Sequence, residues 1–178
     1  MGKTGYDFTG WATRSNIRCT DGRVIEENAF KHCDGMTVPL VWNHQHSEPE
    51  NVLGHADLKY KPGGIYAFCK FNDTQSGEVS KVLVKHGDIV ALSIYANHLK
   101  ERGHDVMHGD ICEVSLVHKG ANPGAFIENV LIHGDNQDEE AIIYSGEPIE
   151  MADILAHSDE IPEEAEEEKE EPEMLKRR

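Results

Sequence analysis

The stretch DICEVSLVHKGANPGAF, residues 110–126, decides the fold class of this chain. Its first half is dominated by apolar residues, as expected of a largely buried β-strand. These residues are Ile111, Val114, Leu116 and Val117. Its second half, residues 120–126, contains glycine and proline, which end a strand in a turn or loop. A buried strand followed by such a turn favours a protein built mainly from β-structure.

Glu113 interrupts the apolar pattern of this strand. A carboxylate in a buried strand is costly unless it is paired with a charge or hydrogen-bonded. Glu113 and Ser115 also alternate with Val114 and Leu116, and this alternation is equally typical of a strand face that points to solvent. The residues alone therefore leave two interpretations open, a buried functional carboxylate or an exposed strand residue.

Strand-like segments separated by turn residues continue along the rest of the chain. They are YDFTGWATR (6–14), MTVPLVWN (36–43), VLGHADLKY (52–60), GIYAFCKF (64–71), DIVALSIYANHL (88–99) and ENVLIHG (128–134). The KPGG turn at residues 61–64 predicts a hairpin between the third and the fourth of these segments. Residues 20–30, TDGRVIEENAF, predict a turn followed by a short helical or irregular piece.

One segment, SGEVSKVLVKHGD (residues 76–88), has the period of a helix instead. The residues that recur at helical spacing are Val79, Val82, Leu83 and His86. Ser76 is the expected cap of this helix, and Gly87 is its expected end. About six or seven strands with this helix predict a mainly β fold with helices (α+β), either a β-barrel or a sandwich with helical insertions.

The acidic residues are concentrated in the C-terminal part of the chain. The chain has 33 acidic and 17 basic residues. Residues 135–178 contain 17 of the acidic and 4 of the basic residues, a net charge of −13. Residues 1–134 contain the other 16 acidic and 13 basic residues, a net charge of −3. We therefore expect a nearly neutral domain over 1–134 and an acidic linker or tail over 135–178. No basic patch is large enough to neutralise many phosphates, which argues against direct nucleic-acid binding.

The acidic segment itself has two parts. Apolar residues scattered through residues 139–160 could form a short docking helix. Residues 161–178, IPEEAEEEKEEPEMLKRR, have a low-complexity acidic composition that predicts a solvated, disordered segment. The segment is interpreted either as a solubilising appendage or as a linker that docks on a partner.

The cysteines are widely spaced and form no CxxC pair; they are Cys19, Cys33, Cys69 and Cys112. Because the sequence also shows no signal peptide, we expect reduced thiols in a cytosolic protein. The longest apolar run, IVALSIYA (89–96), is far shorter than a membrane span, so no membrane partner is expected.

The stretch VPLVWNHQHSEPENVLGHADL, residues 38–58, places His44, His46 and His55 close together in the sequence. An HxH pair on a strand points both rings to the same face, which suits zinc, and a third histidine could complete the ligand set. His44 also follows an apolar strand, where it could be a catalytic base or a polar residue without a chemical role. A zinc site and a catalytic base both remain open at this point.

Ser93 lies within an apolar strand, as either a hydrogen-bonded core serine or a nucleophile. A serine, a histidine and a carboxylate from separate strands can form a triad, in which the base activates the hydroxyl and the acid orients the base. The turn at residues 120–126 is either a plain loop or a source of backbone N–H groups for an oxyanion hole. Pro123 has no N–H, so the candidate donors are Ala121 and Asn122.

Several motifs occur in the order found in one protease family. They are TGWATRSNIRCTDGRVIEENAF (9–30), PLVWNH (39–44), VLGHADL (52–58), HGDIVALSI (86–94) and DICEVSLVHKGANPGAF (110–126). From about Tyr6 to Val130 the chain resembles the prohead (capsid-maturation) serine proteases of tailed bacteriophages, which are related to the herpesvirus assemblin proteases. The resemblance implies a herpesvirus-protease-like β-barrel of about six or seven strands with surrounding helices.

The resemblance also implies a set of site residues and needs neither a metal nor a cofactor. They are Ser93 as nucleophile, His44 as general base, Glu113 as the third member of the triad, and the backbone N–H groups of Ala121 and Asn122 as oxyanion donors. One position departs from the family, because Tyr95 stands where a glycine commonly follows the serine by two residues. This departure leaves the shape of the adjacent substrate cleft open.

By the same resemblance, the substrates are the phage scaffold protein, the N-terminal part of the major capsid protein, and the protease itself. Cleavage would occur inside the assembling prohead, in the host cytoplasm, with residues 135–178 docked on the scaffold or removed by self-cleavage. A homodimer is a further expectation, because the herpesvirus relatives are activated by dimerisation. The alternatives are a zinc-binding hydrolase that uses His44, His46 and His55, and a non-catalytic capsid-assembly scaffold protein.

Overall fold

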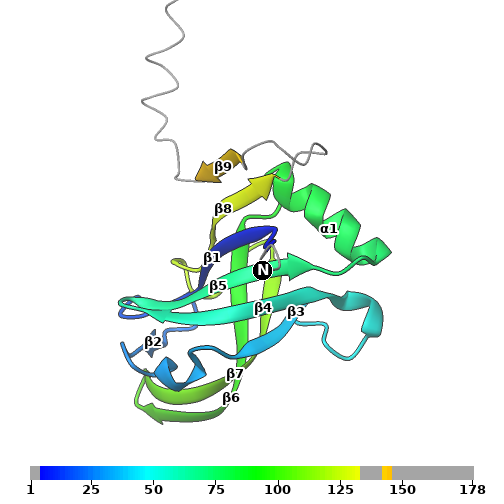
Figure 1. Ribbon diagram of the computed structural model, residues 1–178. Coiled ribbons are helices and arrows are strands. Elements are labelled where there is room, and N and C mark those ends of the chain that lie inside the picture. Colours follow the sequence, from blue (N-terminus) through cyan, green and yellow to red (C-terminus); the bar gives the residue numbers. More distant parts are fainter. Residues whose placement is uncertain (1–4, 133–141, 146–178) are drawn as a thin grey trace, which may run out of the picture. The chain divides into compact units, whose positions relative to one another are not determined.

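The computed structural model describes residues 5–132 and 142–145 (Figure 1). Within these residues nine strands share one sheet. They are β1 (Phe8–Arg14), β2 (Val24–Ile25), β3 (Thr37–Trp42), β4 (Val52–Lys61), β5 (Gly64–Phe71), β6 (Ala91–Arg102), β7 (Asp105–Val117), β8 (Ile127–Ile132) and β9 (Ile142–Ser145). The same residues include one α-helix, α1 (Gln75–Lys85), and two short 3-10 helices, η1 (Lys31–Cys33) and η2 (Pro49–Asn51).

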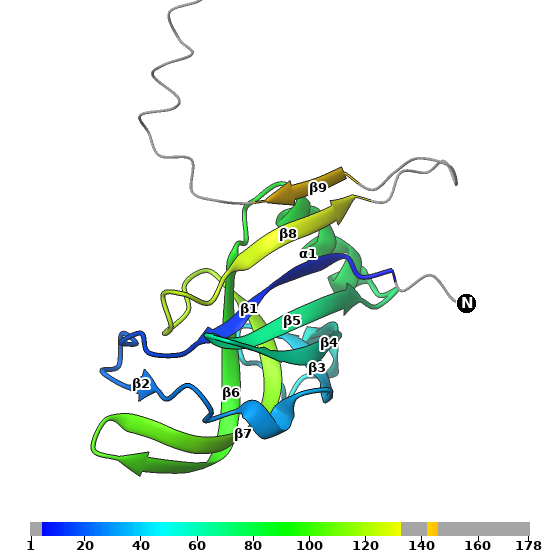
Figure 2. The ribbon, with the colours of Figure 1, turned by 60° about the vertical axis from the view of Figure 1, so that its left-hand side comes forward.

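The strand β7 organises the sheet because it pairs with three other strands. β6 runs antiparallel to it, whereas β2 and β3 run parallel to it, one near each end. From β3 the order continues through β4, β5, β1, β8 and β9, all antiparallel to their neighbours. Figures 1 and 2 show the long β6–β7 pair running across the direction of β1, β4 and β5.

The expectation of a mainly β protein with helices is confirmed, but the expected closed barrel is wrong. The strand order is an open path with β2 at one end and β9 at the other. An isolated bridge between Ala91 and Phe126, and a hydrogen bond from Ile127 N to Val90 O (2.9 Å), join the start of β6 to the start of β8. The two segments therefore meet at a single position and do not form a ladder of paired residues, so the sheet stays open.

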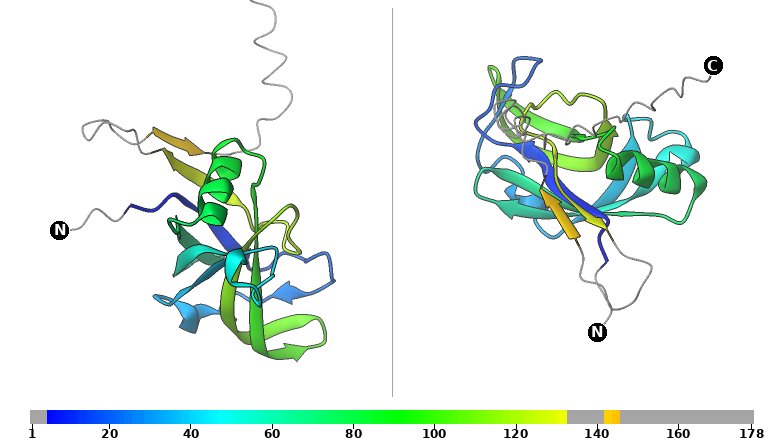
Figure 3. Two further views of the ribbon diagram at one scale, coloured as in Figure 1. Left: turned by 90° about the vertical axis from the view of Figure 1, so that its right-hand side faces the viewer. Right: turned by 90° about the horizontal axis from the view of Figure 1, so that it is seen from above.

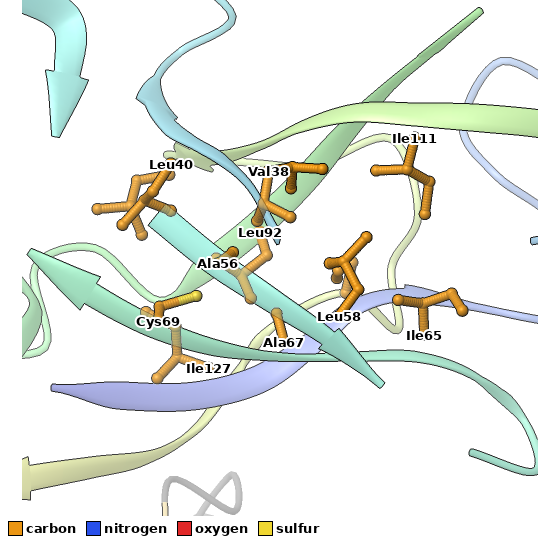
Figure 4. Close-up of a cluster of buried hydrophobic side chains, with 14 of the residues drawn as sticks. Val38, Leu40, Ala56, Leu58, Ile65, Ala67, Cys69, Leu92, Ile111 and Ile127 are labelled. Atoms are coloured by element: carbon orange, nitrogen blue, oxygen red, sulfur yellow. The ribbon is translucent and has the colours of Figure 1, made fainter. Parts of the chain in front are cut away.

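One hydrophobic core fixes the strands that carry the site. Buried apolar side chains from six strands pack together in it, as Figure 4 shows. They include Val38, Leu40, Ala56, Leu58, Ile65, Ala67, Cys69, Leu92, Ile111 and Ile127. Burying a large aliphatic side chain contributes about 1.5–3 kcal/mol. Because Leu92 adjoins Ser93, and Ile111 lies two residues before Glu113, the packing of this core holds both residues in place.

The helix α1 begins two residues earlier than its pattern predicts. Thr74 is its N-cap, and the Oγ1 of Thr74 accepts a hydrogen bond from Gly77 N at 3.1 Å. The expected cap, Ser76, is therefore wrong, because Thr74 already occupies the extended position from which a side chain reaches the first free N–H groups. The expected end is confirmed: Gly87 has a φ of +77°, a conformation that glycine adopts at no steric cost.

The face that α1 presents to the sheet also differs from the expectation. Val79 and Val82 are 55% and 47% exposed. The fully buried residues of the helix are Gly77, Ser80 and Val84. Of the residues that the pattern singled out, Leu83 is partly buried and packs against the core. The small residues Gly77 and Ser80 let α1 pack closely against β4, β5 and β8 (Figure 3). An ion pair between Lys81 Nζ and Asp7 Oδ1 (2.9 Å) fixes the same orientation of the helix.

Two remaining expectations concern segments outside the long strands. Residues 20–30 contain β2 and lead into η1, so this irregular piece is anchored to β7 by parallel pairing. In the segment 139–160, the described residues Ile142–Ser145 form a strand paired with β8 instead of a helix. The rest of the acidic tail lies outside the described residues. By its contacts the chain divides into the units Met1–Glu147 and Pro148–Arg178.

None of the helices in the described part of the chain combines the length and the apolar character that crossing a membrane requires.

Candidate active site

His44 lies directly after β3, in a turn that the parallel pairing with β7 holds in place. Asn43 N donates to Leu116 O (2.9 Å), and Gln45 N donates to Trp42 O (2.9 Å). Asn43 and His44 have φ values of +47° and +59°, in the left-handed region that residues other than glycine seldom occupy. Such strain persists only where the surrounding structure fixes it, and it is concentrated at functional sites. The turn directs His44 back toward β7.

The β6–β7 pair supplies the other two residues of the candidate triad. In its register Ser93 lies opposite Ser115, and Tyr95 lies opposite Glu113. The end of β3 pairs with the other edge of β7, at residues Val114 to Leu116. Because β7 lies between β3 and β6 at this point, side chains from three separate strands converge.

The structure brings Ser93, His44 and Glu113 into one line of hydrogen bonds. His44 Nδ1 lies 2.8 Å from Glu113 Oε1, and His44 Nε2 lies 2.9 Å from Ser93 Oγ. An ionised carboxylate can only accept, so the hydrogen of a neutral His44 ring is on Nδ1. Nε2 is then left as the acceptor for the hydroxyl hydrogen of Ser93, which is the arrangement that activates a serine.

Glu113 is buried, with its side chain only 4% exposed, so the solvent-facing interpretation is wrong. Its Oε1 also accepts from Ser115 Oγ (3.1 Å), and its Oε2 lies 2.9 Å from His46 Nδ1. Strand alternation did predict that Glu113 and Ser115 share a face, but the turn that carries His44 and His46 covers this face. The three donors satisfy both oxygens of the carboxylate, as a buried charge requires.

The supporting roles of two residues, Ser115 and His46, escaped the sequence reasoning. Ser115 donates to Glu113 and accepts from His44 N (3.1 Å), so it links the acid to the backbone of the base. His46 holds the second oxygen of the carboxylate, and its ring lies 5.3 Å from the ring of Tyr95. The spacing of two residues between Glu113 and Ser115 could have predicted their contact, because residues two apart in a strand share a face.

The three histidines of residues 44–55 do not form a metal site. His55 lies on β4, opposite Pro39 and Lys70 in the strand ladders. Within the described residues, the only His, Cys, Asp or Glu group with ligand atoms close enough to share one metal ion is a different one. The predicted zinc site at His44, His46 and His55 is therefore wrong, because β4 carries His55 away from the turn.

A pocket of about 370 Å³ opens beside Ser93. Its wall includes Tyr95 and Leu99 from β6, Phe30 from the segment before η1, and the turn residues Ala121 and Asn122. Tyr95, at the position where the resemblance leads one to expect glycine, therefore shapes this pocket directly. Ser93 faces a space that can receive a substrate and is not enclosed in the core.

The turn at residues 120–126 is held tightly next to β6. Asn122 Nδ2 donates to Arg14 O (2.7 Å) and to Thr13 Oγ1 (3.2 Å), while Asn122 Oδ1 accepts from Gly124 N (3.0 Å). No acceptor for the N–H groups of Ala121 or Asn122 occurs among the residues that the structure describes. Unpaired amides at the wall of the pocket are the kind of donor that an oxyanion hole requires.

The pocket also contains a thiol, Cys19. Burial raises the pKa of Cys19, and the nearby charge of Asp21 adds to the effect. The thiol therefore stays protonated at neutral pH, and a protonated thiol is a poor nucleophile. Ser93, with a ring nitrogen at hydrogen-bonding distance, is the better placed nucleophile of the two.

Comparison with known proteins adds independent evidence. The family model described as caudovirus prohead serine protease matches residues 4–140. Neither the curated proteins nor the solved structures contain a match to the chain, so the likeness to the herpesvirus protease fold stays a prediction. The match covers most of the chain and includes all of the site residues described in this section. The chain belongs to the caudovirus prohead serine protease family.

Proposed function

We propose that the chain is a serine endopeptidase of capsid maturation that uses Ser93, His44 and Glu113 as a catalytic triad. The observation that carries the proposal is the hydrogen-bond line from Glu113 through both ring nitrogens of His44 to Ser93 Oγ. Membership of a serine protease family supports the same chemistry. The three groups come from separate strands but lie at the distances and in the order that acyl transfer requires.

In the first step Ser93 Oγ attacks the carbonyl carbon of the substrate peptide bond. His44 Nε2 takes the hydroxyl proton as the new carbon–oxygen bond forms. The imidazolium that results keeps its Nδ1–H on Glu113, which remains ionised and stabilises the positive charge. The protonated Nε2 then gives its proton to the leaving amine as the peptide bond breaks, and an acyl-enzyme remains.

The second step repeats the same proton transfers with water. His44 removes a proton from a water molecule, whose oxygen attacks the acyl carbon, and then returns a proton to Ser93 Oγ. In both steps a negative charge develops on the carbonyl oxygen of the substrate. The N–H groups of Ala121 and Asn122 are the proposed donors to this oxygen, and each such donor contributes roughly a hundred- to thousandfold to the rate.

The substrates proposed for this activity are the scaffold protein, the N-terminal part of the major capsid protein, and the protease itself. The family supports action inside the assembling capsid, in the host cytoplasm. We also propose that Pro148–Arg178 keeps the protease with the scaffold, and that the active form is a homodimer. Deletion of residues 148–178 leaves β9 intact and should lower incorporation into proheads while peptide cleavage persists. Unchanged incorporation would contradict the proposal that this segment docks on the scaffold.

The deciding experiment compares Ser93→Ala and His44→Ala with the wild-type chain, each co-expressed with the capsid and scaffold proteins of the same phage. Both variants should abolish processing, which is followed by gel mobility and by mass spectrometry of the capsid-protein N-terminus. Ser80→Ala is the matched control, because it removes a buried serine hydroxyl from α1, away from the pocket. Processing that persists in Ser93→Ala would contradict the proposal.

The remaining alternative predicts another result in the same experiment. A non-catalytic assembly protein would leave the capsid protein uncleaved even with the wild-type chain.

A further inference from the structure

A second group of histidines surrounds a carboxylate on β7, outside the proposed triad. His108 and Asp110 lie two residues apart on β7, and His32 comes from η1. One ligand atom from each of these three side chains lies within 4.8 Å of the others. All three side chains are partly exposed, so a dissolved ion can reach them.

The contacts within this group centre on Asp110. Its Oδ1 lies 2.8 Å from His32 Nε2 and 4.0 Å from His108 Nε2. The rings of His32 and His108 stack with their centres 4.3 Å apart. The other oxygen, Oδ2, lies 2.8 Å from Nδ1 of a third ring, that of His98. Both oxygens of the carboxylate are thus oriented by imidazoles from two different elements, η1 and β6.

The backbone is distorted where it places His98 next to Asp110. The β6–β7 register shifts between the pairs Asn97↔Asp110 and Lys100↔His108, so β6 has an additional residue at this point. His98 has a φ of +49°, in the left-handed region. A bulge re-aims a side chain, and a strained residue other than glycine points to a function at the same place.

We propose that His32, His108 and Asp110 bind a first-row divalent cation, with zinc as the preferred ion, and that His98 positions the carboxylate. Imidazole nitrogens with a carboxylate oxygen are a donor set that zinc favours, usually in tetrahedral geometry. Two ligand atoms of a tetrahedral zinc ion lie about 3.3 Å apart. Because His108 Nε2 now lies 4.0 Å from Asp110 Oδ1, the exposed rings need to move by about 1 Å. On binding, the neutral His32 ring would carry its hydrogen on Nδ1, so that Nε2, which now contacts Asp110 Oδ1, is free to bind the ion.

A bound ion would join two parts of the fold that shape the pocket beside Ser93. His32 follows Phe30 by two residues, and His98 precedes Leu99; both Phe30 and Leu99 line that pocket. The ion would therefore tie the segment before β3 to the β6–β7 pair and stabilise this wall. The proposal does not depend on catalysis, because binding and stability can be measured in the Ser93→Ala chain.

The test uses the full-length Ser93→Ala chain, stripped with a chelator and titrated with Zn²⁺ alone by calorimetry. One ion should bind per chain, and the midpoint of thermal unfolding should rise with Zn²⁺. His108→Ala and Asp110→Asn should abolish both effects, and His98→Ala should weaken binding roughly tenfold, as loss of a residue that orients a ligand does. His55→Ala is the matched control, because it removes an exposed histidine from β4.

Two results would overturn the proposal. One is the absence of saturable Zn²⁺ binding in a chain whose circular dichroism shows that it is folded. The other is binding that survives both His32→Ala and His108→Ala, or that is lost in His46→Ala, because the ion would then bind elsewhere. Co²⁺ gives a second readout, since its visible absorption band is intense only in a tetrahedral site and should disappear in the same variants.

Discussion

Two carboxylates on β7 lie three residues apart, contact histidines, and differ in exposure. The side chain of Glu113 is 4% exposed and contacts His44 and His46, whereas that of Asp110 is 43% exposed and contacts His32 and His98. Hydrogen bonds, with His98 the larger contributor and His32 the second, hold the pKa of Asp110 below its ordinary value. The strand β7 therefore carries two histidine–carboxylate groups, one shielded from water and one exposed to it.

The difference shows what burial adds to a histidine–carboxylate pair. Near bulk water such a pair is screened and contributes little energy, so the groups around Asp110 can rearrange around an added ion at low cost. Away from water the same interaction is stronger, and an unsatisfied oxygen would be costly. Glu113 therefore needs Ser115 and both histidines, and this complete set fixes the orientation of the His44 ring. The buried group suits catalysis, and the exposed group suits ion binding.

The largest expected effect among the tests of this difference is that of Glu113→Gln on the rate of cleavage. The amide can donate a hydrogen bond to His44 Nδ1 and so favour the wrong tautomer of the ring, which lowers kcat by roughly 10⁴-fold in comparable triads. The measurement is the steady-state rate on a peptide that spans the capsid-protein cleavage site. A fall of less than about tenfold would show that Glu113 does not orient the base.

A smaller effect is expected from Ser115→Ala, which removes one donor to Glu113 and the acceptor of His44 N. A hydrogen bond to a charged group is worth about 1.5–3 kcal/mol, or roughly a ten- to hundredfold change in rate. We expect the loss in kcat and a shifted pH–rate profile, with KM nearly unchanged. Ser115→Thr keeps the hydroxyl and should restore much of the rate. If both variants lose activity while their pH–rate profiles match that of the wild type, Ser115 has a packing role instead.

His46→Ala should have a milder effect, because His46 contacts the second oxygen of Glu113 and the ring of Tyr95, and no hydrogen bond between His46 and Ser93 occurs within the described residues. We expect a decrease of up to roughly tenfold in kcat/KM, the value of one partly exposed charge-assisted hydrogen bond. The same assay of His44→Ala gives the matched comparison, since that variant should be inactive. Equal losses in the two variants would mean that His46 takes part in the proton transfers.

The smallest effect on catalysis is expected from Asp110→Asn. This variant should keep the wild-type kcat/KM in metal-free buffer, because Asp110 touches neither Ser93 nor His44. It should nevertheless lose the rise in unfolding temperature that Zn²⁺ gives to the parent chain. A substantial loss of activity without metal would show that the two carboxylates are coupled, and that their exposure does not separate their roles.

The sequence predicted most of the long strands because their apolar patterns are local. β2 and β9 were missed, since two- and four-residue strands are ordered by their partners and carry little pattern of their own. The packed face of α1 was misjudged because Gly77 and Ser80 allow close approach, whereas a periodicity argument looks for large apolar residues. The open sheet could not be foreseen either, because closure depends on how distant strands meet.

The candidate site was predicted through family motifs rather than through spacing. Ser93, His44 and Glu113 are far apart in the chain, and only the pairing of β7 with both β3 and β6 brings them together. His108 and Asp110 are close in sequence, but His32 is 78 positions from Asp110, so the second group had no local signal. Its members became visible only when the bulge in β6 and the position of η1 were known.

The wide separation of the proposed triad in sequence has a consequence for folding. His44 is 49 positions from Ser93 and 69 from Glu113, and the parallel β3–β7 pairing that joins them closes a long loop. Closing long loops has an entropic cost, and contacts of this kind slow folding. On refolding, we expect peptide cleavage to return no earlier than the slowest phase of tryptophan fluorescence, and earlier activity would contradict this. A newly synthesised chain would thus remain inactive until its last distant strands pair.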